Sequence, residues 1–94
     1  MNNLATAGIG NELHMIYLDD KGDIYHRIRH ADGVWSQWGK IAGGQFTRVS
    51  CAGVGQELHV TAVNRAEVWY HAIRHRNEQW QGFAQLPDQP LLNE

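Results

Sequence analysis

The sequence predicts an all-β fold built from two four-stranded antiparallel units in one chain. The first support is an internal repeat: residues 7–14 return almost unchanged as residues 52–59, and residues 25–30 return as residues 70–75. The second support is turn chemistry, because short segments rich in β-branched and aromatic residues alternate with glycine, asparagine and aspartate clusters. The offset of 45 residues needs no gap, so it is a structural period.

Four strands fit each unit. We expect them at residues 4–9, 12–18, 24–29 and 35–41 in the first unit, and at residues 47–54, 57–63, 67–75 and 79–86 in the second. Gly10 and Gly55 supply the first tight turn of each unit, because glycine accepts positive φ. The later turns of the first unit contain Gly22 and Gly33, which the second unit lacks. Its later turns are therefore expected to be less regular.

A repeated four-stranded antiparallel unit of about 40 to 45 residues is typical of a β-propeller blade. We therefore expect blade 1 at residues 1–45, blade 2 at residues 46–87 and a C-terminal tail at residues 88–94. Propellers typically close with about 4 to 8 blades, so two blades alone leave faces and edges uncovered. The sequence predicts a ring completed by homo-oligomerisation, with a trimer of six blades favoured over a tetramer of eight.

Composition and charge exclude several classes of partner. The net charge is −2 and both signs are interspersed, which predicts no nucleic-acid partner. No apolar run approaches the roughly 18 residues of a membrane span, so membrane insertion is not expected. The first residues lack the basic and apolar regions of a signal peptide, which predicts synthesis in the cytoplasm and leaves the final location open.

Polar residues persist between the two units while apolar residues drift. All six histidines fall into pairs at the repeat spacing, yet Ile24 becomes Trp69 and Trp38 becomes Phe83. A repeat that kept only a core would preserve apolar character and let polar identity change. The pattern therefore indicates that something polar is done once per repeat.

Metal and enzyme sites are not expected. His26 and His30 have a spacing that suits zinc on a helix, but on a strand they lie about 13 Å apart, which is too far for one metal ion. The sequence contains no nucleophile elbow, no glycine-rich phosphate loop and no Cys–His set. We therefore expect no catalytic residues, no metal and no cofactor.

Alternate residues on a strand share a face, which places Tyr25 with Arg29 and leaves His26 on the other side. Carboxylates from the preceding strand, Glu12 and Glu57, are expected to reach the arginines, which then either brace the blade or donate to vicinal hydroxyls. Tryptophan rings either wedge neighbouring blades apart or stack on the C–H face of a sugar. The candidate ligand-binding residues are Glu12, Tyr25, Arg29, Trp35, Trp38, Glu57, Trp69, Tyr70, Arg74 and Trp80.

The order of these motifs resembles a known family. Glu-Leu-His at residues 12–14, Tyr-His-x-Ile-Arg-His at 25–30, Asp-Gly at 32–33 and Trp-x-x-Trp at 35–38 resemble the repeat of bacterial propeller lectins of the Photorhabdus fucose-binding type. More loosely, they are similar to tectonin and tachylectin-like repeats. Those lectins carry many blades in a single chain, whereas this chain has two. The resemblance implies glycan sites between adjacent blades, with fucose or galactose-like ligands as leading candidates.

Two functions remain open from the sequence. The first is a multivalent, lectin-like module that binds carbohydrate in clefts between adjacent blades. The second is a non-catalytic structural or protein-interaction propeller, in which the repeated polar residues form a buried hydrogen-bond network that specifies blade packing.

Overall fold

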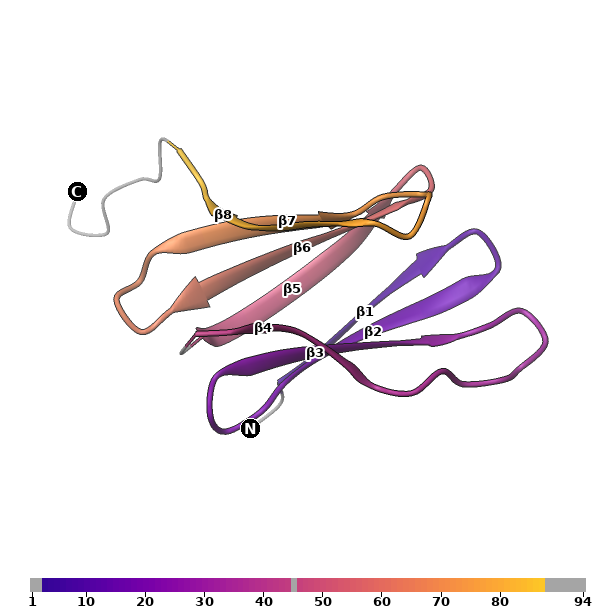
Figure 1. Ribbon diagram of the computed structural model, residues 1–94, viewed down its shortest axis with the longest axis horizontal. Coiled ribbons are helices and arrows are strands. Elements are labelled where there is room, and N and C mark those ends of the chain that lie inside the picture. Colours follow the sequence, from indigo (N-terminus) through magenta and orange to yellow (C-terminus); the bar gives the residue numbers. More distant parts are fainter. Residues whose placement is uncertain (1–2, 45, 88–94) are drawn as a thin grey trace.

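The computed structural model describes residues 3–44 and 46–87, and within them the chain forms two four-stranded antiparallel sheets and no helix (Figure 1). Each sheet runs in sequence order, so within a sheet every strand pairs with its neighbour along the chain. The predicted all-β class with two four-stranded sheets is confirmed. The strands are β1 (Leu4–Ile9), β2 (Glu12–Leu18), β3 (Asp23–Arg29) and β4 (Gly39–Gly43) in the first sheet, and β5 (Phe46–Val54), β6 (Glu57–Asn64), β7 (Trp69–Arg74) and β8 (Trp80–Gln85) in the second.

Across the described part of the chain, no helix exists that is long and apolar enough to cross a membrane. The tail expected at residues 88–94 lies outside the described residues.

The fourth strand of the first sheet differs from the prediction. It runs over Gly39–Gly43 and not over residues 35–41. Trp35 makes only an isolated bridge to Arg29, and the backbone N–H of Ile28 donates to the hydroxyl of Ser36 at 2.9 Å. A side chain thus takes the place of a ladder carbonyl, and the backbone leaves the strand until Gly39.

The later turns of the second sheet are more regular than predicted. Glu67 and Glu78 adopt φ values of 63° and 71° at the positions where the first sheet has Gly22 and Gly33, whose φ values are 84° and 88°. The same backbone hydrogen bond closes the first turn of each pair, at 3.1 Å in the first sheet and 3.0 Å in the second. Two glutamates therefore accept a conformation that costs an L-residue about 1–2 kcal/mol, and the prediction of irregular turns is wrong.

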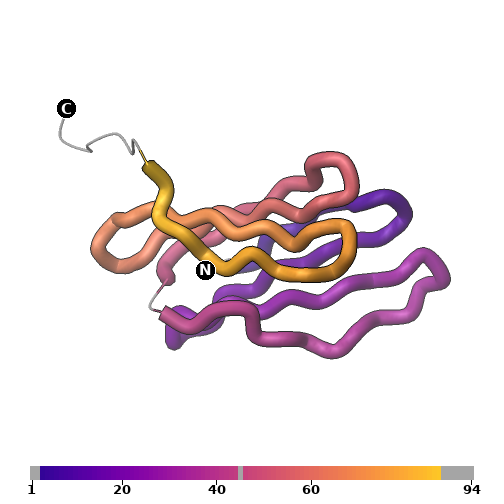
Figure 2. The backbone as a smooth tube through the Cα atoms, turned by 45° about the horizontal axis from the view of Figure 1, so that its top comes forward, coloured from indigo at the N-terminus to yellow at the C-terminus, as the bar shows by residue number. Residues whose placement is uncertain are grey.

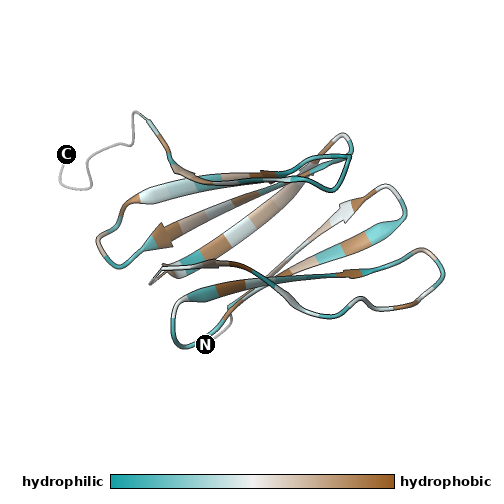
Figure 3. Cartoon of the chain, in the orientation of Figure 1, coloured by the Kyte–Doolittle hydropathy of each residue, from teal (hydrophilic) through white to brown (hydrophobic). Residues whose placement is uncertain are grey.

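The two sheets lie face to face as two layers (Figures 1 and 2). Hydrophobic and hydrophilic residues alternate along β2 (Figure 3), so one side of the first sheet supplies apolar side chains to the contact. The buried residues of the core come from both sheets: Ile9, Ile16, Leu18, Ile24, Phe46, Leu58, Val60 and Ala62. The first strands of the two sheets approach most closely, since a Cβ on Gly53 would lie 2.6 Å from the carbonyl oxygen of Gly8.

The two sheets expose different faces to each other. We call the side that carries His14 and His26 in the first sheet, and His59 and His71 in the second, the histidine face. The opposite side, which carries Arg29 in the first sheet and its counterpart in the second, is the arginine face. The histidine face of the first sheet packs on the arginine face of the second, and the other two faces are open. The sheets are therefore stacked head to tail.

Candidate functional site

A connected row of polar side chains, which we call a Glu–His chain, crosses the first sheet. Nδ1 of His30 lies 2.8 Å from one carboxylate oxygen of Glu12, and the other oxygen lies 3.6 Å from Nε2 of His14. Nδ1 of His14 then lies 2.9 Å from Nε2 of His26, with the two rings stacked at a centroid distance of 5.1 Å. The repeated histidines of this sheet thus belong to one connected arrangement.

The second sheet repeats the chain contact by contact. His75 lies 2.8 Å and His59 3.3 Å from the two carboxylate oxygens of Glu57, and Nδ1 of His59 lies 2.9 Å from Nε2 of His71. Because a carboxylate only accepts, the nearer ring nitrogen of each neighbouring histidine donates to it. His59 and His14 then each accept at Nδ1 from Nε2 of the next ring.

Burial between the sheets sets the protonation state of the Glu–His chain of the first sheet. Burial between the sheets, together with the charges of His14 and Arg74, lowers the pKa of His26 to about 3. Burial and the Arg74 guanidinium also lower the pKa of His14, against the opposing effect of Glu12. The hydrogen bond from His30 lowers the pKa of the Glu12 carboxyl. At neutral pH this Glu–His chain therefore contains the ionised carboxylate of Glu12 and neutral imidazoles at His14 and His26.

This arrangement corrects one expectation. Glu12 and Glu57 were expected to reach Arg29 and Arg74, but both oxygens of each carboxylate lie against histidines. Arg74 instead lies toward the first sheet, where its charge acts on the buried histidines, and one of its terminal nitrogens lies 3.9 Å from Glu78. The repeated glutamates thus organise the interior of each sheet.

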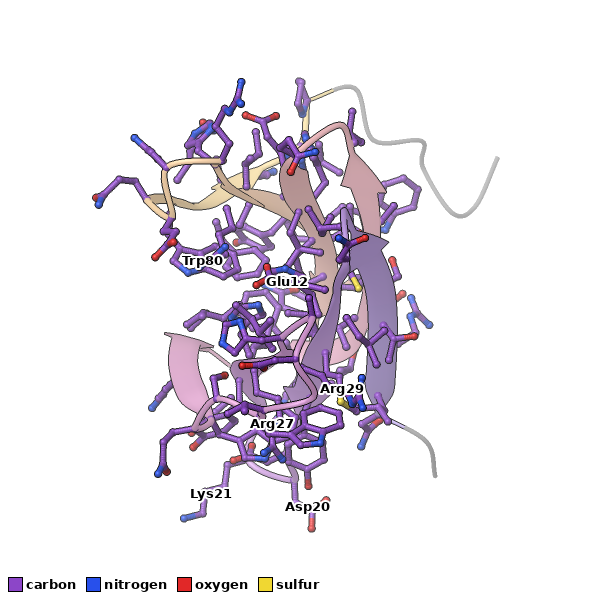
Figure 4. All side chains as sticks on the ribbon, turned by 90° about the vertical axis from the view of Figure 1, so that its right-hand side faces the viewer. Glu12, Asp20, Lys21, Arg27, Arg29 and Trp80 are labelled. Carbon is purple, nitrogen blue, oxygen red and sulfur yellow. The ribbon has the colours of Figure 1, made fainter. Side chains whose placement is uncertain are left out.

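Trp80 lies at the contact between the sheets. Its ring meets the ring of His26 edge to face at a centroid distance of 5.3 Å and packs against the core. Figure 4 shows Trp80 and Glu12 close together between the layers, and Arg27 and Arg29 on the far side of the first sheet. Trp80 has the wedge position expected for a tryptophan between blades, whereas Trp35, at the same point of the repeat, is 42% exposed.

The open arginine face of the first sheet carries an aromatic group. The guanidinium carbon of Arg27 lies 4.6 Å from the ring centroid of Trp35 and 5.1 Å from that of Trp38. The ring of Trp38 also lies 5.9 Å from Tyr17, which in turn lies 6.5 Å from Tyr25. These distances are typical of cation–π contacts, so Arg27 holds the two indole rings in place and also puts a positive charge on this face.

Beside this group lies an open pocket, which we call the outer pocket. It has a volume of about 450 Å³ and is lined by Tyr17, Asp19, Tyr25 and Trp38. Three rings supply apolar walls and one carboxylate supplies acceptors. Oδ1 of Asp19 accepts from the backbone N–H groups of Lys21 and of Asp23, at 3.0 and 2.9 Å, so the carboxylate is held in place by its own turn.

A second pocket lies where the two sheets meet, and we call it the inter-sheet pocket. It has a volume of about 300 Å³, and its lining residues are Ile41, Ala42, Gly43, Gly44, Phe46, Asn64, Tyr70 and Phe83. Asn64 is held as Asp19 is, because its Oδ1 accepts from the N–H groups two and four residues later. The ring of Tyr70 meets that of Phe46 edge to face at 5.7 Å.

The two pockets occupy equivalent places in the repeat. Asn64, Tyr70 and Phe83 of the inter-sheet pocket stand 45 residues after Asp19, Tyr25 and Trp38 of the outer pocket. Each therefore combines rings on the arginine face with a polar side chain from the turn after the second strand. The inter-sheet pocket has in addition a wall from the neighbouring sheet.

The predicted site residues are thus divided among several places. Tyr25 and Trp38 meet in the outer pocket, and Tyr70 lines the inter-sheet pocket. Trp69 lines a separate apolar pocket of about 330 Å³, together with Thr61, Ala62, Val63 and Leu86. The remaining predicted residues line neither the outer nor the inter-sheet pocket: Glu12, Arg29, Trp35, Glu57, Arg74 and Trp80.

Sequence reasoning missed Tyr17, Asp19, Arg27 and Asn64. A search for identical residues in the repeat passes over Tyr17 and Arg27, whose counterparts are Ala62 and an alanine of β7. Asp19 lies in a turn, where a carboxylate is usually solvated and gives no signal of a site. The useful signal was the exchange of aspartate for asparagine, since both side chains accept backbone hydrogen bonds in the same turn.

Within residues 3–44 and 46–87, no group of three or more His, Cys, Asp or Glu side chains is arranged to hold a metal ion. No protein-family model, no curated protein and no solved structure matches the chain.

Proposed function

We propose that the chain is a non-catalytic, carbohydrate-binding subunit of a β-propeller that copies of the chain complete together. The ligands are fucose or galactose-like sugars, as the resemblance to the propeller lectins implies. Binding occurs in the clefts between adjacent blades, of which the inter-sheet pocket is one. A trimer with six blades is favoured over a tetramer with eight.

One observation carries the binding proposal. The outer and the inter-sheet pocket pair aromatic walls with a fixed carboxylate or amide at the same repeat positions, Asp19 or Asn64 beside Tyr25 or Tyr70. The apolar C–H face of a pyranose packs on aromatic rings, while its hydroxyl groups need fixed hydrogen-bonding partners. Both requirements are met without any acid–base pair, which is why binding rather than hydrolysis is proposed.

The volumes fit a small ligand held at an open surface. Pockets of about 300 and 450 Å³ lie at the lower end of the range typical of ligand sites, roughly 300–1,000 Å³. Single sites of this kind bind weakly. A ring with many such sites gains apparent affinity for a glycan-coated surface, by about 10²–10⁴ where the geometry permits simultaneous contact.

The test is binding to a glycan array, followed by titration with the best sugar. In Trp38→Ala the outer pocket loses a wall, and we expect its affinity to fall by about tenfold, because an aromatic contact contributes roughly 0.5–1.5 kcal/mol beyond the area it buries. Val34→Ala is the matched control, since Val34 is exposed and lines neither the outer nor the inter-sheet pocket.

A second variant probes the polar wall. Asp19→Asn copies the residue of the inter-sheet pocket and keeps the turn hydrogen bonds, so the fold should be unchanged. We expect a change of sugar preference with affinity altered less than tenfold. Absence of binding to any sugar, with a folded protein, would contradict the proposed function.

The Glu–His chains support the second candidate function, a structural or protein-interaction propeller. Within the first sheet His30 bonds to Glu12 and His14 bonds to His26, while the other ring nitrogen of His14 is buried 3.6 Å from Glu12 without a hydrogen-bond partner. A mostly internal polar network of this kind would specify blade geometry and not a ligand contact. If the protein binds no glycan but loses its fold in Glu12→Gln, this candidate takes precedence.

A further inference from the structure

The contact between the two sheets of one chain is a template for a contact between chains. It joins a histidine face to an arginine face, and the chain keeps one open copy of each: the arginine face of the first sheet and the histidine face of the second. Because the faces differ, copies joined in this way associate head to tail, and each new contact again leaves one face of each kind open.

The exposed apolar side chains mark these open faces. Leu13 is 37% exposed, and its repeat counterpart Leu58 is buried at 1% in the contact between the sheets. Val54 is 56% exposed on the second sheet, whereas its counterpart Ile9 is buried at 7%. Among residues 3–44 and 46–87, the same relation holds for six of the seven large exposed hydrophobic residues, whose counterparts all belong to the core or pack against it: Leu4, Leu13, Tyr17, Trp35, Trp38 and Val54.

A glycine gives independent support. A Cβ on Gly53 would lie 2.6 Å from both the carbonyl oxygen of Gly8 and Cδ1 of Ile9, so the contact between the sheets requires glycine there. Gly8 is its repeat counterpart, and a Cβ at Gly8 would meet nothing within 4 Å. Gly8 lies inside β1 and is not among the glycines with positive φ. Nothing within a single chain therefore requires glycine at this position, although glycine weakens a strand.

We propose that the arginine face of the first sheet binds the histidine face of the second sheet of another copy, and that this copy completes the outer pocket. Gly8 then lies against the second copy's β5 as Gly53 lies against β1. The ring of Trp35 then meets His71 of the second copy, just as the ring of Trp80 meets His26 within one chain.

The missing wall of the outer pocket comes from the second copy. In the inter-sheet pocket, Ile41 and Ala42 of the first sheet form the wall opposite the rings. Their repeat counterparts are Leu86 and Pro87, which stand at the C-terminal end of the second sheet. In the head-to-tail contact these two residues face Tyr25 and its neighbours, and the outer pocket becomes a cleft of the inter-sheet type.

Charge agrees with this pairing. Within the chain, the charge of Arg74 acts on both buried histidines, His14 and His26, and His14 lies 3.6 Å from the Glu12 carboxylate. The open arginine face carries Arg27 and Arg29, and the open histidine face carries the Glu57 carboxylate. The contact between copies therefore brings cations toward an anion and repeats the arrangement inside the chain.

Native mass in solution tests the inference, measured by analytical ultracentrifugation on the full chain at micromolar concentration. The wild type should have a mass of several chains. Gly8→Val should be a folded single chain, because a β-branched residue suits the strand but blocks the contact. Gly82→Val is the matched control, since Gly82 also lies in a strand with nothing within 4 Å of a Cβ, and it should assemble as the wild type does.

A mixing experiment tests the head-to-tail geometry. Thr61→Arg places a bulky charge on the open histidine face, at the position whose counterpart Ile16 is fully buried, and should also give single chains. Gly8→Val and Thr61→Arg each keep one good face, so a one-to-one mixture should form pairs of two chains. A contact between like faces would instead let one of the two variants pair with itself, so pairs in either variant alone, or no pairs in the mixture, would overturn the inference.

The inference rests on the proposed propeller, but its outcome is separable from sugar binding. A wild-type single chain at micromolar concentration, or assembly of Gly8→Val equal to that of Gly82→Val, would overturn it. A ring that binds no sugar would support the head-to-tail contact and contradict the binding function. Single chains of Gly8→Val that still bind sugar weakly through the inter-sheet pocket, beside a tighter wild-type ring, would support both.

Discussion

The Glu–His chains of the two sheets have the same contacts in different surroundings. The rings of His14 and His26 meet at 2.9 Å, and so do those of His59 and His71. The first pair is buried between the sheets under Trp80, whereas the side chain of His59 on the open face is 24% exposed. The geometry of the chain is therefore set within each sheet, and its burial is supplied by the neighbouring sheet.

The largest expected effect is a difference in the loss of unfolding free energy between equivalent leucines on the two arginine faces. Leu58→Ala removes a buried side chain from the contact between the sheets, and should lower the free energy of unfolding by about 2–5 kcal/mol. Leu13→Ala removes the same atoms from the open face, and should cost less than about 1 kcal/mol in a single chain. Urea unfolding measures both, in the Gly8→Val background so that association does not contribute.

Equal losses for Leu58→Ala and Leu13→Ala in that background would mean that the two leucines have similar surroundings, contrary to the structure. If copies associate as proposed, Leu13→Ala in the wild-type background should by contrast weaken the association.

Acid should first destabilise the buried Glu–His chain of the first sheet. The pKa of His26 is lowered from 6.5 to about 3, so the unfolded chain binds a proton at a higher pH than the folded one. Its contribution to stability is complete above pH 6.5 and is lost as the pH falls from 6.5 toward 3, by about 2 kcal/mol at pH 5. The lowered pKa of Glu12 adds a loss only below its usual value of 4.5, so the range from pH 6.5 to 5 reports on histidine.

Urea unfolding between pH 7.5 and 5 measures this dependence. His26→Gln should reduce it and leave the smaller part due to His14, while His71→Gln, on the open face, should leave it in place. A wild type whose stability is constant over that range would contradict the buried, neutral state of His26.

The smallest expected effect concerns the turns. Glu78 has a φ of 71° where the first sheet has glycine. Glu78→Gly should raise the free energy of unfolding by about 1 kcal/mol, because glycine adopts positive φ without strain. Glu78→Ala is the control: it removes the same charge, keeps a Cβ, and should give no gain. A gain in both variants would assign the effect to the charge and not to the backbone.

Much of the fold could be predicted because strand alternation and the repeat are local signals. In β3, Ile24, His26 and Ile28 are buried while Tyr25 and Arg29 lie on the other side, as a period of two requires. Seven of the eight strands lie within two residues of their predicted limits at each end. The exception is β4, where the hydroxyl of Ser36 replaces a backbone acceptor, and no pattern of hydrophobicity encodes that exchange.

The candidate site was harder to predict because it depends on distances across strands. Glu12 can reach either a histidine or an arginine from the start of β2, and only the pairing of β2 with β3 shows that His30 lies within 2.8 Å. The outer pocket was missed because Tyr17 and Arg27 occur in one unit only. Residues repeated in both units build each sheet, whereas Tyr17 and Arg27 distinguish the first sheet from the second and leave no trace in the repeat.

The joint between β4 and β5 has a consequence for the effect of dilution. Two residues separate Gly43 from Phe46, so the two sheets of a chain are held at an effective concentration on the order of millimolar or more. The contact inside a chain therefore persists in dilute solution, whereas a contact between copies depends on how much protein is present. Dilution should empty the outer pocket of ligand before the inter-sheet pocket, and the protein would bind as a multivalent ring only where it accumulates.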